Sequence, residues 1–418
     1  MSATYAVITA VTKTQYTQPK VYWIAYANNP DFGTIAKKED WAGDNYIIAL
    51  QLEIPQGGGL SIQLGINHLA AGVYKRFTLT RVNDYGVARV DGEAIAATRT
   101  NQGALIDIWK REMEGAIATV RRSACIHMWR DGTGARGQIS SGSNVNSNVL
   151  TLQQPSDITG FAVGLTCQFS TGTNTAGAGT GGALRSTANA VVTAIDRING
   201  ILTFGGVTNL AATITGLAVY DWILRDGDLN AVIKGAGAWC PITAVTAGVL
   251  FNGLDRSTDT RLVGGYVNAS GMTVREAIIE AMARVEVEEG DADAVWLNVR
   301  DRGTLVKELE GKSIYMKETV AIKGSSASVG YDVMEAEFDG QKVKVMSSVN
   351  VPRTRGFVTQ WNTWQFASLE PAPHIIKDDG LDAIRVSTSD AIELRVCYRG
   401  DMGTFAPPFT QQLFNLGQ

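Results

Sequence analysis

The sequence predicts an α+β protein with two or three lobes, and three observations support this prediction. The chain has 418 residues, which corresponds to between two and three domains of about 150 residues each. One long amphipathic helix is expected over 102–129, and β segments bounded by glycine lie before and after it. Beyond residue 273, predicted helices and strands alternate.

Composition excludes several classes of protein. The chain carries 37 basic and 41 acidic residues, for a net charge of −4, whereas a protein that coats nucleic acid should be basic. Charged residues make up 19% of the chain, below the roughly 25% of an average soluble domain. A long chain this poor in charge must hide much of its surface, and a large homo-oligomer is one way to do so. No apolar run reaches about 18 residues, so no membrane contact is predicted; residues 1–22 lack the apolar core of a signal peptide.

No constellation of residues predicts catalysis, a cofactor or a metal. The three histidines, His68, His127 and His374, are not spaced as metal ligands, and His127 lies near an apolar stripe where a packing role is favoured. Two glycine-rich matches at 132–137 and 177–182 lack the strand-before, helix-after context of a dinucleotide site, so both are interpreted as surface loops. The four cysteines form no CxxC pair, and we expect buried free thiols in a reducing cytosol: Cys125, Cys167, Cys240 and Cys397.

The N-terminal quarter predicts two arms. Residues 1–44 sustain no long period and predict an extended N-terminal arm. Residues 45–98 predict a β-arm, with an apolar strand that stops at Pro55 and a glycine run, followed by two further strands. Strands without a helix to bury them are unstable alone, so this β-arm should lie on something else.

Residues 99–139 contain the clearest helix. Its apolar positions recur at a spacing of three and four residues, and charged residues occupy the other faces: Leu105, Trp109, Met113, Ala116, Ile117, Val120, Ala124 and Met128 form the stripe. At 1.5 Å per residue the helix would be roughly 40 Å long, so it should act as a structural axis. We expect Trp109 and Met113 to be buried under a sheet.

Residues 140–232 predict an all-β module inserted into a larger domain. Asp157 is the only charged residue between 137 and 184, and Asn199-Gly200 between two apolar strands is a strong signal for a type I′ hairpin. The ends of such a module should lie close together. The alternative is that these strands extend the sheet of the larger domain.

The rest of the chain alternates helix and strand. Within 233–355, Thr273 and Glu276 form a capping box for a helix to about residue 286. A buried strand, a short helix and a hairpin turned by Asp339-Gly340 follow it, at 293–299, 302–310 and 331–346. Residues 356–418 are β-rich again.

This order of elements resembles the major capsid proteins of tailed double-stranded-DNA bacteriophages, whose HK97-like shell fold has an N-arm, an E-loop, a peripheral domain with a spine helix, and an axial domain. The segments that carry the resemblance are 74–96 for the returning strand of the E-loop, 102–128 for the spine helix, 254–257, 262–264 and 294–298 for the axial domain, and 378–380 for the return to the peripheral domain. The resemblance thus implies an N-arm, an E-loop, a peripheral domain, an insertion module, an axial domain and returning peripheral strands over the ranges 1–44, 45–98, 99–139, 140–232, 233–355 and 356–418.

The same resemblance implies a structural function without enzymatic activity. The chain would assemble with itself into hexamers and pentamers of an icosahedral head shell, in the host cytoplasm, and would end in the virion. Implied partners are a portal, a separate scaffolding protein, a decoration protein, and packaged double-stranded DNA enclosed without sequence-specific binding. The insertion module would lie on the outer face. Two alternatives stay open: an encapsulin-like compartment shell that holds a cargo enzyme, and a soluble β-rich hydrolase.

Overall fold

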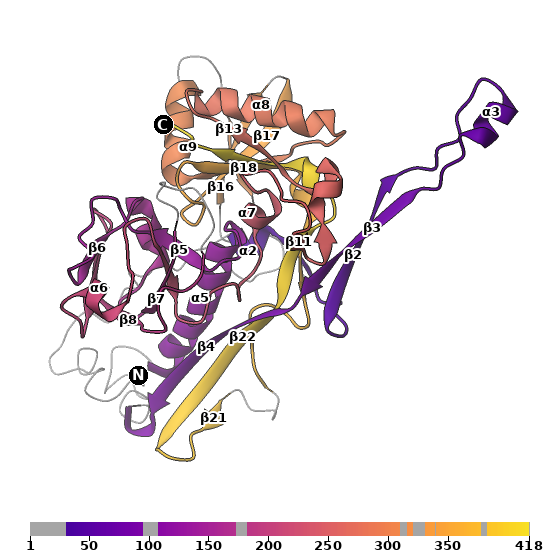
Figure 1. The fold of residues 1–418 in the computed structure, drawn as a ribbon. Helices are drawn as coiled ribbons and strands as arrows, with labels where there is room; N and C mark the ends of the chain where they lie inside the picture. The colour runs from indigo at the N-terminus through magenta and orange to yellow at the C-terminus, as the bar shows by residue number, and fades with distance from the viewer. Residues whose placement is uncertain are drawn as a thin grey trace.

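The computed structural model describes residues 31–94, 108–172, 182–309, 316–320, 331–338, 340–377 and 383–417. The predictions made for 1–30, 102–107, 177–181 and 378–380 lie outside these residues, as does the side chain of Trp109. The described part is of the α+β class, as predicted, with three sheets of six or seven strands and two small two-stranded sheets (Figure 1). Among the described helices, none is both long enough and apolar enough to span a bilayer.

The central body is a sheet with one long helix across its face. Strand β4 (Val82–Asp91) runs antiparallel to β22 (Ala391–Thr404) along its whole length, and α5 (Ile108–Met128) packs on this pair (Figure 1). Gly86 allows the close approach, because a Cβ there would lie 2.6 Å from Cγ2 of Val120. The remaining strands of this sheet are β1 (Ala36–Lys38), β19 (Trp364–Ser368), β20 (His374–Ile375) and β21 (Ile384–Arg385).

Residues 31–44 are packed into this body. Three apolar side chains of this segment lie in the core: Phe32 in the short helix α2 (Asp31–Thr34), Ile35 directly after it, and Trp41 beyond strand β1. The buried Asp31 carboxylate accepts hydrogen bonds from Trp129 Nε1 (3.1 Å), Asn350 Nδ2 (3.0 Å) and the hydroxyl of Ser348. The described part of the arm predicted for 1–44 is residues 31–44. It does not extend freely, because three buried apolar side chains and one buried carboxylate fix it to the body.

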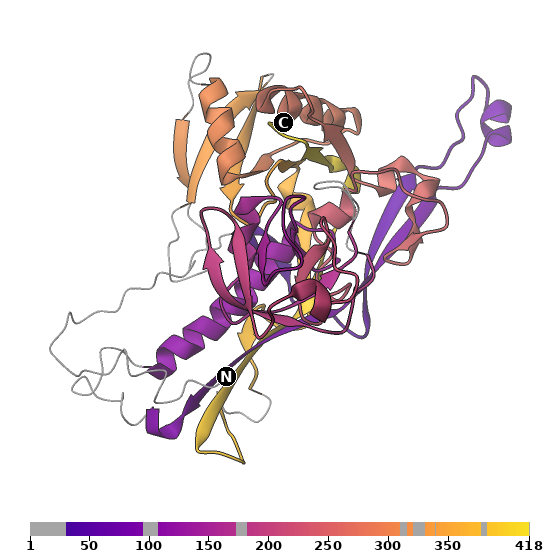
Figure 2. The same ribbon diagram turned by 60° about the vertical axis from the view of Figure 1, so that its left-hand side comes forward.

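The insertion forms a sheet of its own beside α5 (Figure 2). Its interior is apolar and includes Phe161, Phe169, Phe204 and Ile223. The sheet has no strand pairing with the other described sheets, which favours a separate module over an extension of the central sheet. Its strands, in spatial order, are β5 (Ala135–Gln138), β10 (Trp222–Arg225), β7 (Thr166–Ser170), β8 (Ala190–Asp196), β9 (Ile201–Gly205) and β6 (Val149–Thr151), with the short helix α6 (Leu210–Thr213) at their side.

The turn between β8 and β9 differs from the prediction. A hairpin is present, but its turn covers residues 197–200, and of Asn199 and Gly200 only Gly200 has a positive φ, so a two-residue type I′ turn is wrong here. The carboxylate of Asp196 accepts hydrogen bonds from the backbone N–H groups of Ile198 (2.9 Å) and Asn199 (3.2 Å). These hydrogen bonds from the turn to a side chain stabilise a loop of more than two residues. The strand pattern of the sequence does not indicate this longer loop.

The third lobe is a seven-stranded sheet covered by two helices (Figure 1). The predicted capping box is confirmed: Thr273 precedes α8 (Val274–Val287), and its hydroxyl accepts from the N–H of Glu276. The strand, the short helix and the hairpin predicted next are confirmed as β14, α9 (Val299–Leu309) and β16–β17. In spatial order the strands are β13 (Gly265–Asn268), β23 (Thr410–Phe414), β18 (Arg355–Thr359), β14 (Ala294–Asn298), β17 (Gln341–Ser348), β16 (Tyr331–Phe338) and β15 (Met316–Val320).

An aromatic cluster joins the end of α5 to the third lobe. The ring of Trp129 lies 4.9 Å from that of Trp296 on β14, 5.4 Å from Phe357 on β18 and 5.8 Å from Trp361, measured between centroids. Trp364 is also buried. The C-terminal tryptophans are therefore packing anchors, and these contacts hold the two lobes in one body.

Candidate assembly interface

One hairpin projects from the body of the molecule. Strands β2 (Asn45–Glu53) and β3 (Val73–Thr80) pair antiparallel, and the short helix α3 (Ile62–Asn67) lies at their far end. The far end of the hairpin, with α3, extends away from the rest of the molecule in both views (Figures 1 and 2). The projecting segment is thus residues 45–80, narrower than the predicted 45–98, because β4 pairs with β22 instead of continuing the arm.

The base of the hairpin is held firmly by the body. Phe77 is fully buried, and its ring lies 4.8 Å from that of Trp239, between centroids. The Thr78 N–H donates to the carbonyl of Asn252 (2.8 Å). Arg261 donates from Nη1 to the carbonyl of Leu52 (2.8 Å) and pairs through Nη2 with the carboxylate of Glu53. These contacts fix the direction in which the far half of the hairpin points.

The tip of the hairpin is apolar, uncharged and exposed. Between residues 54 and 74 the sequence contains no Lys, Arg, Asp or Glu. Leu60, Ile62 and Leu69 are 103%, 85% and 75% exposed, and α3 buries none of its residues. A hollow of about 510 Å³ opens between α3 and the glycine-rich segment 57–59 that precedes it. Side chains of this kind gain stability only when another surface removes them from water.

A second region, the charged junction, joins the insertion to the central body. It consists of Asp84 on β4, His127 on α5, Arg136 on β5, and Arg225 and Asp228 at the end of β10. Arg225 Nη2 lies 2.8 Å from Asp84 Oδ1, Arg225 Nε lies 2.8 Å from Asp228 Oδ1, and Arg136 Nη2 lies 3.2 Å from Asp228 Oδ2. The acidic and basic groups of the charged junction pair with one another, and these ion pairs hold the insertion and the central body together.

The protonation states at the junction follow from its surroundings. Burial opposes ionisation of Asp228, but the hydrogen bond with His127 and the charges of Arg136 and Arg225 outweigh it and lower the pKa of Asp228 to about 2. Burial lowers the pKa of His127, whose Nε2 lies 3.4 Å from Asp228 Oδ2. His127 therefore has the packing role that the sequence predicted, and the junction carries its charges on carboxylates and guanidinium groups.

The glycine-rich segment near the charged junction differs from its prediction. The glycine-rich segment 132–137, predicted as a surface loop, is mostly buried, and a Cβ at Gly134 would lie 2.5 Å from the carbonyl oxygen of Asp228. The chain passes through the charged junction here, and glycine allows the close packing because it has no Cβ. All four cysteines are buried and none of them forms a disulfide, as predicted.

Comparison with known proteins rests on structure alone. No protein-family model matches the chain, and no curated protein matches its sequence. Among solved structures, a chain of the cyanophage A-1(L) capsid asymmetric unit matches with a TM-score of 0.52 at 9% sequence identity, over 97% of both chains. The chain has the HK97-like capsid fold. This finding confirms the fold predicted from the order of elements.

Other solved structures with this capsid fold match less closely. A chain of the capsid of a native GTA particle matches with a TM-score of 0.48 at 10% identity, over 100% of this chain and 99% of that one. A chain of the SrpI encapsulin complex from Synechococcus elongatus PCC 7942 matches with a TM-score of 0.45 at 8% identity, over 98% and 94%. The fold assignment depends on the cyanophage chain.

Proposed function

We propose that this protein is the major capsid subunit of a tailed double-stranded-DNA phage, which assembles with itself into the icosahedral head shell around the genome. The observation that carries the proposal is the exposed apolar tip, residues 54–74, on a hairpin that projects from a capsid fold. In this proposal β2–β3 is the E-loop, α5 is the spine helix of the peripheral domain, and the seven-stranded lobe is the axial domain. That lobe includes β18 and β23, which belong to the segment 356–418 predicted as returning peripheral strands, so the predicted boundary at 355 differs from the structure.

The shape of the hairpin favours a second copy of the chain as its partner. A projecting tip that binds a different surface on the next subunit makes a heterologous contact, and repeated heterologous contacts form a ring when the rotation between subunits closes. Rings of six and five subunits are the hexamers and pentamers that we propose. The apolar tip would be covered in each ring by the neighbouring subunit, which removes the exposed Leu60, Ile62 and Leu69 from water.

The proposed role is structural and without catalysis. The net charge of −4 suits a lining that encloses DNA without gripping its phosphates, since tight binding would hinder packing and release. We propose assembly in the host cytoplasm with a separate scaffolding protein and a portal, residence in the virion, and a decoration protein on the outer surface. The insertion, residues 140–232, would face outward and brace neighbouring subunits.

A charge placed on the hairpin tip tests the assignment. We expect the double variant Leu60→Asp, Leu69→Asp to stay folded, because both side chains are exposed. We expect it to sediment as single subunits and the natural chain to sediment as large particles. The matched control is Val287→Asp, since Val287 is 80% exposed at the end of α8, and this variant should still form particles. Normal particles from the tip variant would show that the tip is not the assembly contact.

The contents of native particles separate the shell of a virus from that of a compartment. A phage head holds DNA that resists nuclease, whereas an encapsulin-like shell holds a cargo enzyme. We expect nuclease-resistant double-stranded DNA in particles purified from their natural source. A co-purifying enzyme without such DNA would contradict the phage assignment.

A further inference from the structure

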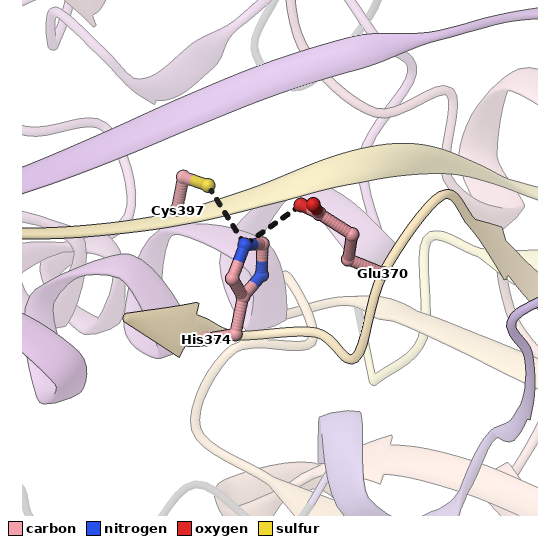
Figure 3. A group of neighbouring side chains, drawn as sticks. All are labelled: Glu370, His374 and Cys397. Carbon is pink, nitrogen blue, oxygen red and sulfur yellow. Dashed lines mark hydrogen bonds and ion pairs between the residues drawn. The ribbon is translucent and has the colours of Figure 1, made fainter. Parts of the chain in front are cut away.

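Three side chains from neighbouring segments meet around one histidine nitrogen (Figure 3). His374 on β20 and Cys397 on β22 are directly opposite each other in an antiparallel pair, which places both side chains on one face of the sheet. Nε2 of His374 lies 3.6 Å from Sγ of Cys397 and 2.7 Å from Oε2 of Glu370, four residues earlier in the chain. The three ligand atoms lie within 4.8 Å of one another.

The other nitrogen of the ring is already engaged. Nδ1 of His374 lies 2.9 Å from the carbonyl oxygen of Pro371, and a carbonyl oxygen only accepts, so Nδ1 carries a proton and donates it. In a neutral ring, Nε2 is then an unprotonated lone pair. A backbone carbonyl that binds the far nitrogen in this way is the usual support of a metal-bound histidine, because it fixes the tautomer and the ring orientation.

A single proton cannot satisfy both contacts of Nε2. If Nε2 carries a proton, it donates to Glu370 and offers no lone pair to the thiol of Cys397. If Nε2 is a lone pair, it accepts from the thiol but faces the carboxylate of Glu370 at 2.7 Å, where two acceptors repel. One cation between the three atoms would attract all of them at once.

The distances and the ligand types fit one class of cation. In a tetrahedral zinc site with ordinary bond lengths, nitrogen and sulfur ligands lie about 3.6 Å apart and nitrogen and oxygen ligands about 3.4 Å apart. The nitrogen–sulfur distance already matches, and the nitrogen–oxygen distance of 2.7 Å has to widen, which the half-exposed side chain of Glu370 allows. Thiolate, imidazole and carboxylate together favour zinc over calcium or magnesium, which prefer oxygen ligands.

We propose that Glu370, His374 and Cys397 form a binding site for a zinc-class divalent cation, with water as the fourth ligand. Binding releases the thiol proton, and any proton on Nε2, to solvent, and the two negative ligands balance the two charges of the cation. Nη1 of Arg399 lies 3.4 Å from Oε2 of Glu370 and competes for the carboxylate, which has a second oxygen to offer. The bound cation would tie the segment that contains β20 to the long strand β22.

Cobalt(II) is the probe for this site, because its spectrum reports both thiolate ligation and geometry. Cobalt(II) is added to the metal-stripped, untagged full-length chain. We expect a thiolate-to-cobalt absorption band in the near ultraviolet that reaches saturation at one equivalent and disappears when zinc is added. The band requires Cys397, the only cysteine in the cluster.

Substitutions of the two partly exposed ligands, His374 and Glu370, test the site without removing the buried Cys397. We expect His374→Gln to abolish the band and Glu370→Gln to weaken cobalt binding at least about tenfold, while circular dichroism shows that both chains remain folded. The control His68→Gln changes an exposed histidine on the hairpin tip and should leave the band intact. Absence of the band in the natural chain, or its full retention in His374→Gln, would overturn the proposal.

Discussion

Arg225 of the insertion and Asp84 of β4 form an ion pair with 2.8 Å between Nη2 and Oδ1. Asp84 is buried, and Arg225 also binds Asp228, which in turn contacts Arg136 and His127. Because the sheet of the insertion has no strand pairing with the other described sheets, side chains of this kind carry the connection between the insertion and the body.

Loss of the Asp84 charge should weaken this connection. We expect Asp84→Asn to lower the free energy of unfolding by about 1–3 kcal/mol, because the guanidinium of Arg225 loses a charged partner in a largely buried setting. Urea unfolding of the subunit measures the change. The matched control is Asp226→Asn, which neutralises an exposed carboxylate next to Arg225 and should change stability by less than about 0.5 kcal/mol. Equal effects of the two substitutions would contradict the assignment of the junction.

The contact between β4 and α5 depends on a glycine. A Cβ at position 86 would lie 2.6 Å from Cγ2 of Val120 and 2.9 Å from the carbonyl oxygen of Ala116. We expect Gly86→Ala to cost about 1–3 kcal/mol through overpacking. Gly115→Ala on α5 meets no atom within 4 Å and should instead stabilise by about 0.5–1 kcal/mol. Thermal unfolding of both variants checks the contrast, and a neutral Gly86→Ala would mean that the helix and strand are not in close contact.

Asp401 predicts a specific pH dependence. Burial raises its pKa to about 7, although the N–H groups of Met402 and Lys234 oppose this. Since the folded pKa exceeds the unfolded value of about 3.9, the stability contributed by this group is full below pH 4 and is lost as the pH rises through 7. The variant Asp401→Asn, which never ionises, should be more stable than the natural chain at pH 8, by about 2–4 kcal/mol.

The difference between the two chains should shrink toward zero near pH 4. Unfolding free energies measured between pH 4 and pH 8 give the comparison, with Asp226→Asn as an exposed control that should show no such trend. A difference that is constant with pH would contradict the assignment of a raised pKa to Asp401.

Residues 139 and 220–221 lie side by side, which closes most of the insertion before its predicted end at residue 232. The Ile139 N–H donates to the carbonyl of Asp221 (2.9 Å), and the Tyr220 N–H donates to the carbonyl of Ile139 (3.0 Å). A short Gly-Ser linker in place of residues 140–220 should therefore leave a soluble, folded chain, because the charged junction remains. We expect fragile or misshapen particles by electron microscopy. An insoluble chain would show that the insertion is part of the body's own core.

Local signals explain the elements that the sequence predicted correctly. The capping box at Thr273 and Glu276 is complete within four residues, and the apolar period of α5 repeats within one segment. Such signals need no knowledge of distant parts of the chain. The hairpin tip also had a local signal, since residues 54–74 contain no charged residue.

Contacts between distant segments explain what the sequence missed. The strand β4 was predicted to continue the arm because its partner β22 begins 300 residues later, at Ala391, and no local pattern indicates that pairing. Burial of 132–137 depends on Asp228, and the cluster at His374 depends on Cys397 across two strands. Sequence spacing alone does not reveal side chains that the fold brings together.

Electron microscopy of the purified full-length chain tests the central claim most directly. If the protein is a capsid subunit, the projecting hairpins engage neighbouring copies, and the images should show closed, hollow shells of uniform diameter, or rings of five and six subunits that precede them. Single subunits or small oligomers at every concentration and salt condition, with no shells or rings, would contradict the account.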